Sequence, residues 1–147
     1  LTAGGYHTCA VLSGGTAKCW GNNGMGQIVN GTTTFRKTPV VVTGLAGATS
    51  ITGGHNHTCA TLADDTVRCW GFNNVGQVGD GSAVQNVLTP AAVADLATVA
   101  SLDAGLYHGC AVLADATMRC WGRNTQAQLG DGTTANRSTP VGVVSDR

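Results

Sequence analysis

The six cysteines of the chain form three pairs with one spacing, because nine residues separate the two members of every pair. The pairs are Cys9 with Cys19, Cys59 with Cys69, and Cys110 with Cys120. In the first pair, both cysteines lie five residues from Gly14, the middle residue of a short polar turn. Residues at equal distances from a tight turn face each other across a hairpin, with β carbons about 4.5–5.5 Å apart. The spacing therefore predicts one disulfide bond per pair, which requires an oxidising compartment.

Zinc binding is the competing chemistry for the same residues. His7, His57 and His108 each stand two residues before a cysteine, so every pair comes with one histidine. Zinc ligands commonly come in pairs about two to four residues apart on turns, whereas these cysteines are expected in the middle of strands. We therefore expect no metal site and no cofactor. The histidines are predicted to be structural and to hydrogen-bond a neighbouring loop.

The chain offers little for an enzyme active site. All eight acidic residues are aspartates, and most stand in predicted turns: Asp64, Asp65, Asp80, Asp115 and Asp131. Local hydrogen bonds within turns account for aspartate at such positions. No GxSxG, HExxH or P-loop motif occurs. His7, His57 and His108 occupy the same position in all three repeats, whereas a catalytic residue is expected only once in a chain. We expect that the protein is not an enzyme.

These residues belong to a repeat that fills the whole chain. Three stretches match one another: GGYHTCAVLSGGTAKCWGNNGMGQ from Gly4, GHNHTCATLADDTVRCWGFNNVGQ from Gly54, and GLYHGCAVLADATMRCWGRNTQAQ from Gly105. The three tryptophans and three prolines keep the same period of 50 or 51 residues. A period of this size, with a glycine and tryptophan signature, is typical of propellers and similar arrays. We expect a single array with repeats at residues 1–48, 49–98 and 99–147.

Each repeat is expected to supply four short strands. In the first repeat, residues 7–12 and 16–21 alternate in polarity around the turn and predict a hairpin. Residues 38–42 form a third strand, and residues 48–52 form a strand that leads into the next repeat. Four strands make one propeller blade. The sequence thus predicts an all-β fold of three propeller-type blades.

The repeated motif, GxxHxCAVL followed by CWGxNxxGQ, GDGTT and TPV, resembles the regulator-of-chromosome-condensation repeat family over essentially the entire chain. Members of that family usually form seven-bladed propellers and serve as protein-binding scaffolds, so the resemblance implies both. This chain departs from the pattern where Val29 and Asn30 replace Gly-Asp, and where Ala127 replaces a glycine. Three blades are fewer than the four to eight that close a ring. We expect a half propeller or open arc, completed by other copies or by a longer parent chain.

Positions that vary between the repeats are the candidate binding positions, because a regular scaffold presents variable loops. They lie before the repeated histidine, after the CWG motif, and in the longer segment that precedes the TP dipeptide. The candidates are Tyr6, His55, Asn56, Tyr107, Phe72, Arg123, Phe35 and Arg36. The longer segment also has a plainer interpretation, as a connection between two strands of one blade.

Charge and hydropathy narrow the range of partners. Eight basic residues balance eight acidic ones, which disfavours nucleic-acid binding, and no apolar run approaches the roughly 20 residues that cross a bilayer. We expect an extracellular or cell-surface protein that binds proteins, including its own copies. Its open ends would join two chains into a six-blade ring, or many chains head to tail into a fibre. Glycan binding at tyrosine and tryptophan is a further alternative.

Overall fold

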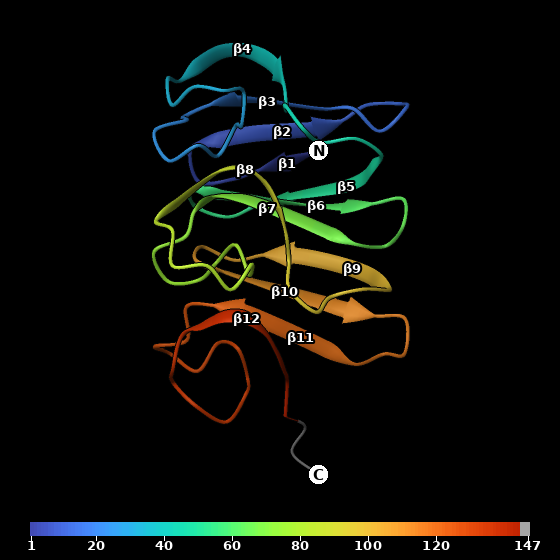
Figure 1. Cartoon of the computed structure of the whole chain (residues 1–147), viewed down its shortest axis with the longest axis vertical. Coiled ribbons are helices and arrows are strands. Elements are labelled where there is room, and N and C mark those ends of the chain that lie inside the picture. The colour runs from blue at the N-terminus through green and yellow to red at the C-terminus, as the bar shows by residue number, and fades with distance from the viewer. Residues whose placement is uncertain (145–147) are drawn as a thin grey trace.

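Three four-stranded antiparallel sheets, stacked along the long axis of the molecule, make up the computed structural model of the chain (Figure 1). The structure describes residues 1–144. The first sheet contains β1 (Thr2–Ala3), β2 (His7–Val11), β3 (Ala17–Gly21) and β4 (Arg36–Val41). The second contains β5 (Ala48–Gly53), β6 (His57–Leu62), β7 (Val67–Phe72) and β8 (Asn86–Ala92). The third contains β9 (Val99–Ala104), β10 (His108–Leu113), β11 (Met118–Gly122) and β12 (Arg137–Gly142).

Strands that are neighbours in sequence are also neighbours in each sheet, so every sheet is an up-and-down meander. The strands predicted for the first repeat agree with β2 to β5 to within two residues at each end. The fold class predicted from the sequence is therefore confirmed. Within residues 1–144, no helix is long and apolar enough to cross a membrane.

The central hairpins have the register that the cysteine spacing predicts. Cys9 lies opposite Cys19, Cys59 opposite Cys69, and Cys110 opposite Cys120. Each pair forms a disulfide bond, with its Cα atoms 4.1 Å apart. The disulfides therefore link the two middle strands of every sheet.

The hydrophobic core lies between the sheets. Alternate side chains of a strand point to opposite faces of its sheet, so each sheet presents apolar groups to its neighbours. One cluster joins the first and second sheets, and includes Cys9, Cys19, Ile28, Ile51 and Trp70. A second cluster joins the second and third sheets, and includes Val67, Val78, Val93, Ala111 and Trp121. We call these interfaces the first and second junctions.

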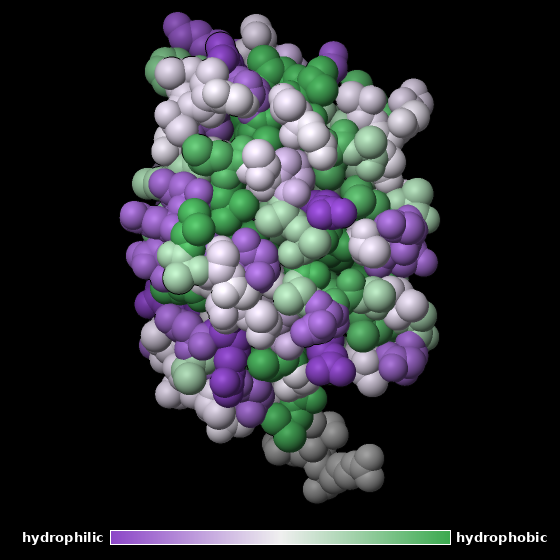
Figure 2. Space-filling model, in the orientation of Figure 1, coloured by the Kyte–Doolittle hydropathy of each residue, from purple (hydrophilic) through white to green (hydrophobic). Residues whose placement is uncertain are grey.

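The sheets are in contact along one edge, where β1, β5 and β9 lie next to one another. The strands at the opposite edge are β4, β8 and β12. Blades of a propeller are arranged in the same way, with one strand of each near the axis and one at the rim. On the face seen in Figure 2, hydrophobic and hydrophilic residues are interleaved along the whole stack.

The glycine that ends each CWG motif is required by a close approach of two loops. Gly21, Gly71 and Gly122 have φ angles of +105°, +99° and +102°, a region that favours glycine. A β carbon at any of them would lie 2.6 Å from a carbonyl oxygen of the loop that precedes the repeated histidine. The loop before β2, β6 or β10 is thereby held against the end of β3, β7 or β11.

Candidate functional site

Four of the predicted binding residues form a row that crosses all three sheets. The rings of Tyr6 and His55 have centroids 5.0 Å apart in an edge-to-face arrangement, and those of His55 and Tyr107 are 5.4 Å apart. The guanidinium carbon of Arg123 lies 5.7 Å from the centroid of Tyr107. We call Tyr6, His55, Tyr107 and Arg123 the aromatic row.

Backbone hydrogen bonds hold the row in place. The amides of Asn22, Phe72 and Arg123 donate to the carbonyls of Tyr6, Asn56 and Tyr107 over 2.8–2.9 Å, one bond in each sheet. Between the sheets, the Gly5 amide donates to the Gly54 carbonyl, and the His55 amide donates to the Leu106 carbonyl, both over 3.0 Å. The variable side chains therefore stand on a fixed backbone.

Phe72 joins the row at a pocket of about 280 Å³. The pocket is lined by Phe72, Asn74, Val75, Tyr107 and Arg123. Its lining contains aromatic rings, one amide and one guanidinium, and no carboxylate. Such a surface suits stacking, cation–π contact and hydrogen bonding.

The remaining candidates lie elsewhere. Asn56 is turned into the first junction, where its Oδ1 accepts a hydrogen bond of 3.0 Å from Nε2 of Gln27. Arg36 is the first residue of β4, the rim strand of the first sheet, and the exposed Phe35 precedes it. Nothing in the structure brings these two residues to the row.

The first junction contains a buried hydrogen-bond network. Nε2 of His7 and Oγ1 of Thr58 are 2.7 Å apart, and the Thr58 hydroxyl donates to the Gln27 carbonyl over 2.9 Å. The indole of Trp70 donates to the same carbonyl, also over 2.9 Å. Burial lowers the pKa of His7 to about 4. Here the repeated histidine and tryptophan link one sheet to the next, which is a structural role.

The second junction keeps the tryptophan contact and lacks the histidine contact. Trp121 donates to the Gln77 carbonyl over 3.1 Å, as Trp70 does to Gln27. Gly109 stands at the position of Thr58, and neither ring nitrogen of the fully buried His57 has a hydrogen-bond partner among the described residues. Burial, together with the neighbouring His7 and His108, lowers the pKa of His57 to about 3.

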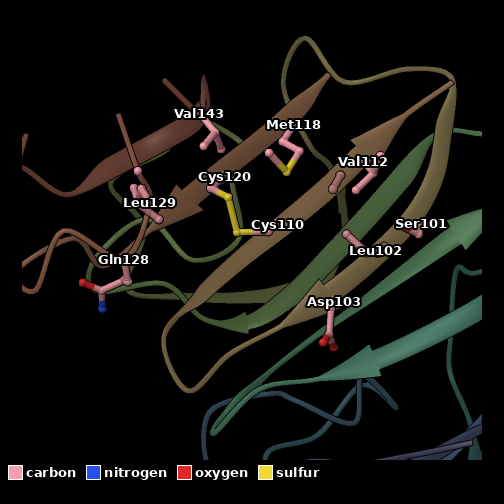
Figure 3. A pocket seen from close by; sticks show the side chains of 12 residues that line it. Ser101, Leu102, Asp103, Cys110, Val112, Met118, Cys120, Gln128, Leu129 and Val143 are labelled. Carbon is pink, nitrogen blue, oxygen red and sulfur yellow. A yellow bond between two sulfur atoms is a disulfide. The ribbon is translucent and has the colours of Figure 1, made fainter. Parts of the chain in front are cut away.

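The outer face of the third sheet carries a hollow of about 510 Å³, which we call the socket. Its lining includes Val112, Met118, Leu129, Val143 and the Cys110–Cys120 disulfide. Figure 3 shows Leu102 and Val112 on one side of the disulfide, and Leu129 and Val143 on the other. The equivalent residues of the first two sheets form the two junctions and are covered by Trp70 and Trp121.

The outer face of the first sheet carries Trp20, the repeat counterpart of the tryptophans that cover the two junctions. Trp20 is half-buried there, whereas Trp70 and Trp121 are fully buried in the junctions. Leu1 is 88% exposed, whereas its counterpart Ile51 is 8% exposed in the first junction. The candidate residues were chosen because they vary between the repeats, and this criterion selects neither Trp20 nor the residues of the socket. The regular spacing of the tryptophans could have indicated Trp20. Trp70 and Trp121 each cover the preceding sheet, whereas Trp20 covers none of the three sheets described.

The aspartates of the turns serve local structure. Asp64 and Asp115 each accept hydrogen bonds from the amide and hydroxyl of the threonine two residues later. Asp131 does the same with Thr133 and also pairs with Arg137, N to O 2.7 Å. These contacts, led by the Thr133 hydroxyl, lower the pKa of Asp131 to about 2. Among residues 1–144, no group of three or more histidine, cysteine or acidic residues is placed to hold a metal.

Two models of one sequence family match most of the chain. A model of the regulator of chromosome condensation (RCC1) repeat matches residues 1–27, 48–77 and 99–128. A second model of that repeat matches residues 15–61 and 64–112. The chain belongs to the RCC1 repeat family. The segments matched by the first model contain the row residues Tyr6, His55, Tyr107 and Arg123, and the tryptophans of the junctions.

Solved RCC1 structures share the fold of this chain. Yeast RCC1 (Prp20), in its complex with Kap60, superposes with a TM-score of 0.87 at 18% identity over 97% of this chain. A second structure of Saccharomyces cerevisiae Prp20p gives a TM-score of 0.83 at 20% identity, again over 97% of this chain. This chain covers 36% and 37% of those two proteins, so it spans about a third of their length.

A relative with higher identity is the ectodomain of the receptor kinase CR4 from Physcomitrella patens. It is 29% identical over 86% of this chain, with a TM-score of 0.54, and this chain covers 30% of it.

Proposed function

We propose that this chain is an extracellular, non-catalytic protein-interaction module that associates with copies of itself. The observation that carries the proposal is the socket. Its residues are the repeat equivalents of those that form the two junctions, and yet the socket is open. An open apolar surface of this kind marks an interaction site.

Three observations support a protein partner and an extracellular location. The Prp20 structures concern binding to Kap60, to Gsp1p and to histones, all of which are proteins. The 29% identical relative is an ectodomain, and three disulfide bonds suit an oxidising environment. Peptide mapping of the chain without reductant, after secretion from a eukaryotic or periplasmic host, should recover the three intrasheet bonds. Six free thiols would argue against an extracellular location.

The self-association is tested by light scattering after size exclusion, on the oxidised chain over a hundredfold range of concentration. We expect a mass that rises above the 14.8 kDa of one chain. A discrete species of two chains would correspond to a six-blade ring. A broad distribution of large species would correspond to a head-to-tail fibre. A chain that stays monomeric at the highest concentration would contradict the proposal.

A second candidate function is binding of a different molecule at the aromatic row, favoured by the exposed ring of Tyr6 and the pocket beside Tyr107. Tyrosine and arginine are common anchors of protein interfaces, and stacked rings also suit sugars. A glycan array probed with wild type and with Tyr107→Ala separates the two. Glycan binding by the wild type that is lost in the variant supports a glycan ligand. An array on which the wild type binds no glycan favours a protein as the ligand of the aromatic row.

A further inference from the structure

We propose that the pocket beside Tyr107 binds a carboxylate on an acidic segment of another protein, with Arg123 as its anchor. This inference rests on the binding function proposed for the aromatic row and names the class of partner. It is carried by a comparison of the two junctions within the chain, because the same loop positions are bridged at the first junction and unbridged at the second.

At the first junction, a buried glutamine amide bridges two loops. Nε2 of Gln27 donates to Oδ1 of Asn22 over 3.2 Å and to Oδ1 of Asn56 over 3.0 Å. One acceptor follows the CWG motif of the first repeat, and the other precedes the repeated histidine of the second. Both protons of the Gln27 amide are therefore paired, and the two loops are tied together.

At the second junction, the corresponding donor has no acceptor. Gln77 takes the place of Gln27, and the two asparagine acceptors are replaced by aromatic residues. These are Phe72 and Tyr107, which line the pocket. Gln77 is fully buried, and its Nε2 has no hydrogen-bond partner among the described residues. A buried donor without an acceptor is costly, so the second junction lacks an acceptor at the two rings that line the pocket.

Arg123 adds an unpaired positive charge at the same place. Its guanidinium carbon lies 5.7 Å from the centroid of the Tyr107 ring, and its Nε donates to the Thr125 hydroxyl over 2.9 Å. Among residues 1–144, the one ion pair joins Arg137 to Asp131, so Arg123 has no carboxylate partner there. The terminal nitrogens of a guanidinium pair with both oxygens of a carboxylate. Charge complementarity therefore selects a carboxylate as the ligand group.

The rest of the pocket suits a peptide better than an acidic sugar. Phe72 and Val75 supply apolar surface for a side chain next to the carboxylate. A sugar needs a hydrogen-bond partner for each hydroxyl that it buries. Apart from Arg123, the lining offers only the hydroxyl of Tyr107 and the amide of Asn74 for this purpose.

A neighbouring hollow extends the pocket. It has a volume of about 340 Å³ and shares Asn74 and Val75 with the pocket beside Tyr107. Asn136 and Ser138 also line it, and their amide and hydroxyl groups can pair with the backbone of a peptide. An extended segment can therefore place its acidic side chain at Arg123 and continue into the second hollow.

A peptide array tests the selection of a carboxylate. The oxidised chain is applied to capped hexapeptides that carry one Glu or Asp beside Phe or Leu, and each acidic spot has a matched spot with Gln or Asn in place of the acid. We expect the wild type to bind the acidic spots roughly tenfold more tightly than the matched amides. Arg123→Gln should lose this preference. Arg36→Gln removes the same charge from the rim strand β4 and should bind like wild type.

Tyr107→Asn tests the comparison of the two junctions. The substitution gives the second junction the acceptor that Asn56 provides in the first. We expect the side-chain amide protons of Gln77 to exchange more slowly with solvent, as measured by NMR, and peptide binding to fall to the level of Arg123→Gln. Unchanged exchange together with unchanged peptide binding would contradict the proposed site.

The outcomes separate this inference from the functions proposed above. Equal binding to acidic and amide spots that is lost in Tyr107→Ala overturns the carboxylate and leaves the aromatic row as a binding site. Binding to acidic glycans and to no peptide overturns the peptide and also leaves the row. Binding to neither class overturns both. Self-association is measured separately by light scattering, where Arg123→Gln should behave like wild type.

Discussion

Each repeated histidine packs against the glycine three residues before it, and this contact explains the GxxH spacing. A β carbon at Gly4 would lie 2.5 Å from Cε1 of His7 and 2.7 Å from the carbonyl oxygen of Gly54. A side chain at this position would therefore displace both the imidazole and the neighbouring sheet. The imidazole is in this way held between two sheets, away from water.

Acid should destabilise the fold through these imidazoles. The pKa of His7 is lowered from 6.5 to about 4, and that of His57 from 6.5 to about 3, chiefly by burial. Below pH 6.5 the unfolded chain therefore binds protons that the folded chain excludes, so stability is full above that pH and falls as the pH drops toward 4. Between pH 7.5 and 5, we expect a loss of about 2 kcal/mol for each of the two histidines.

Urea unfolding at pH 7.5, 6 and 5 measures this loss. His57→Gln should remove about half of it, and His7→Gln is the matched variant in the first junction. A free energy of unfolding that stays constant down to pH 5 would show that the buried imidazoles do not control acid stability.

Ala127 occupies a backbone conformation that suits glycine. Its φ is +55°, whereas the equivalent glycines, Gly26 and Gly76, have +80° and +82°. A left-handed conformation costs a non-glycine residue roughly 1–2 kcal/mol. Ala127→Gly should therefore stabilise the chain by about 1 kcal/mol, measured as a shift of the urea midpoint with an unchanged slope.

Two reverse substitutions serve as controls for Ala127→Gly. Gly14→Ala places a methyl group in open space at φ +88° and should cost about 1 kcal/mol from conformation alone. Gly76→Ala adds a clash with β12 and should cost more. If Ala127→Gly has no effect or destabilises the chain, backbone strain at this position is not significant.

Some of these residue properties can be predicted from the sequence and others cannot. The cysteine pairs are predictable because their partners lie in one hairpin, ten residues apart. The exposure of Trp20 is not predictable from its motif, which is the same as that of Trp70, because exposure depends on whether another sheet covers it. The loss of a partner for His57 depends on Gly109, which is 52 residues away in sequence, so no local pattern contains it.

At the scale of elements, the two junctions share an apolar plan and differ in polar content. In the first, the Thr58 hydroxyl joins His7 to the Gln27 carbonyl. In the second, Gly109 has no side chain, and a β carbon there would lie 2.8 Å from the indole of Trp121. The tryptophan thus fills the space that threonine uses in the second sheet, and the first junction is the better satisfied of the two.

Thr58→Val tests how much the network stabilises the first junction. The substitution keeps the shape and removes the hydroxyl, leaving the buried Nε2 of His7 without its partner. Such a loss costs about 1–3 kcal/mol, which thermal unfolding should register. Thr8→Val is the matched control, because Thr8 lies at the outer face of the first sheet and should change the stability of one chain by less than about 0.5 kcal/mol. Equal effects of the two variants would show that the hydroxyl adds nothing to the junction.

The strands themselves follow from the sequence, whereas their convergence at the aromatic row does not. Period-two alternation around a polar turn determines β2 and β3, as it does the other central hairpins. The positions of the loops that vary between repeats can also be predicted from the sequence. That Tyr6, His55 and Tyr107 meet in one row, while Asn56 turns inward toward Gln27, depends on how neighbouring sheets are rotated against each other. This rotation results from the packing of the whole stack.

At the scale of the molecule, three equal sheets produce two covered junctions and two uncovered faces. The uncovered faces are the socket and the outer face of the first sheet, which carries Trp20, and each is the counterpart of a surface buried inside the chain. The row lies across the loops of all three sheets, so it belongs to neither face. The aromatic row and the socket are therefore separate surfaces of the chain.

The salt dependence of the proposed self-association distinguishes apolar docking at the socket from attraction between charges. The chain has no net charge, and Asp103 is the one charged residue among those that line the socket. Salt at 0.5 M screens exposed charges over only a few ångströms and leaves apolar burial intact. The association constant from sedimentation equilibrium should therefore change by less than about twofold between 50 and 500 mM NaCl. A tenfold weakening would mean that surface ion pairs hold the copies together, and would place the contact away from the socket.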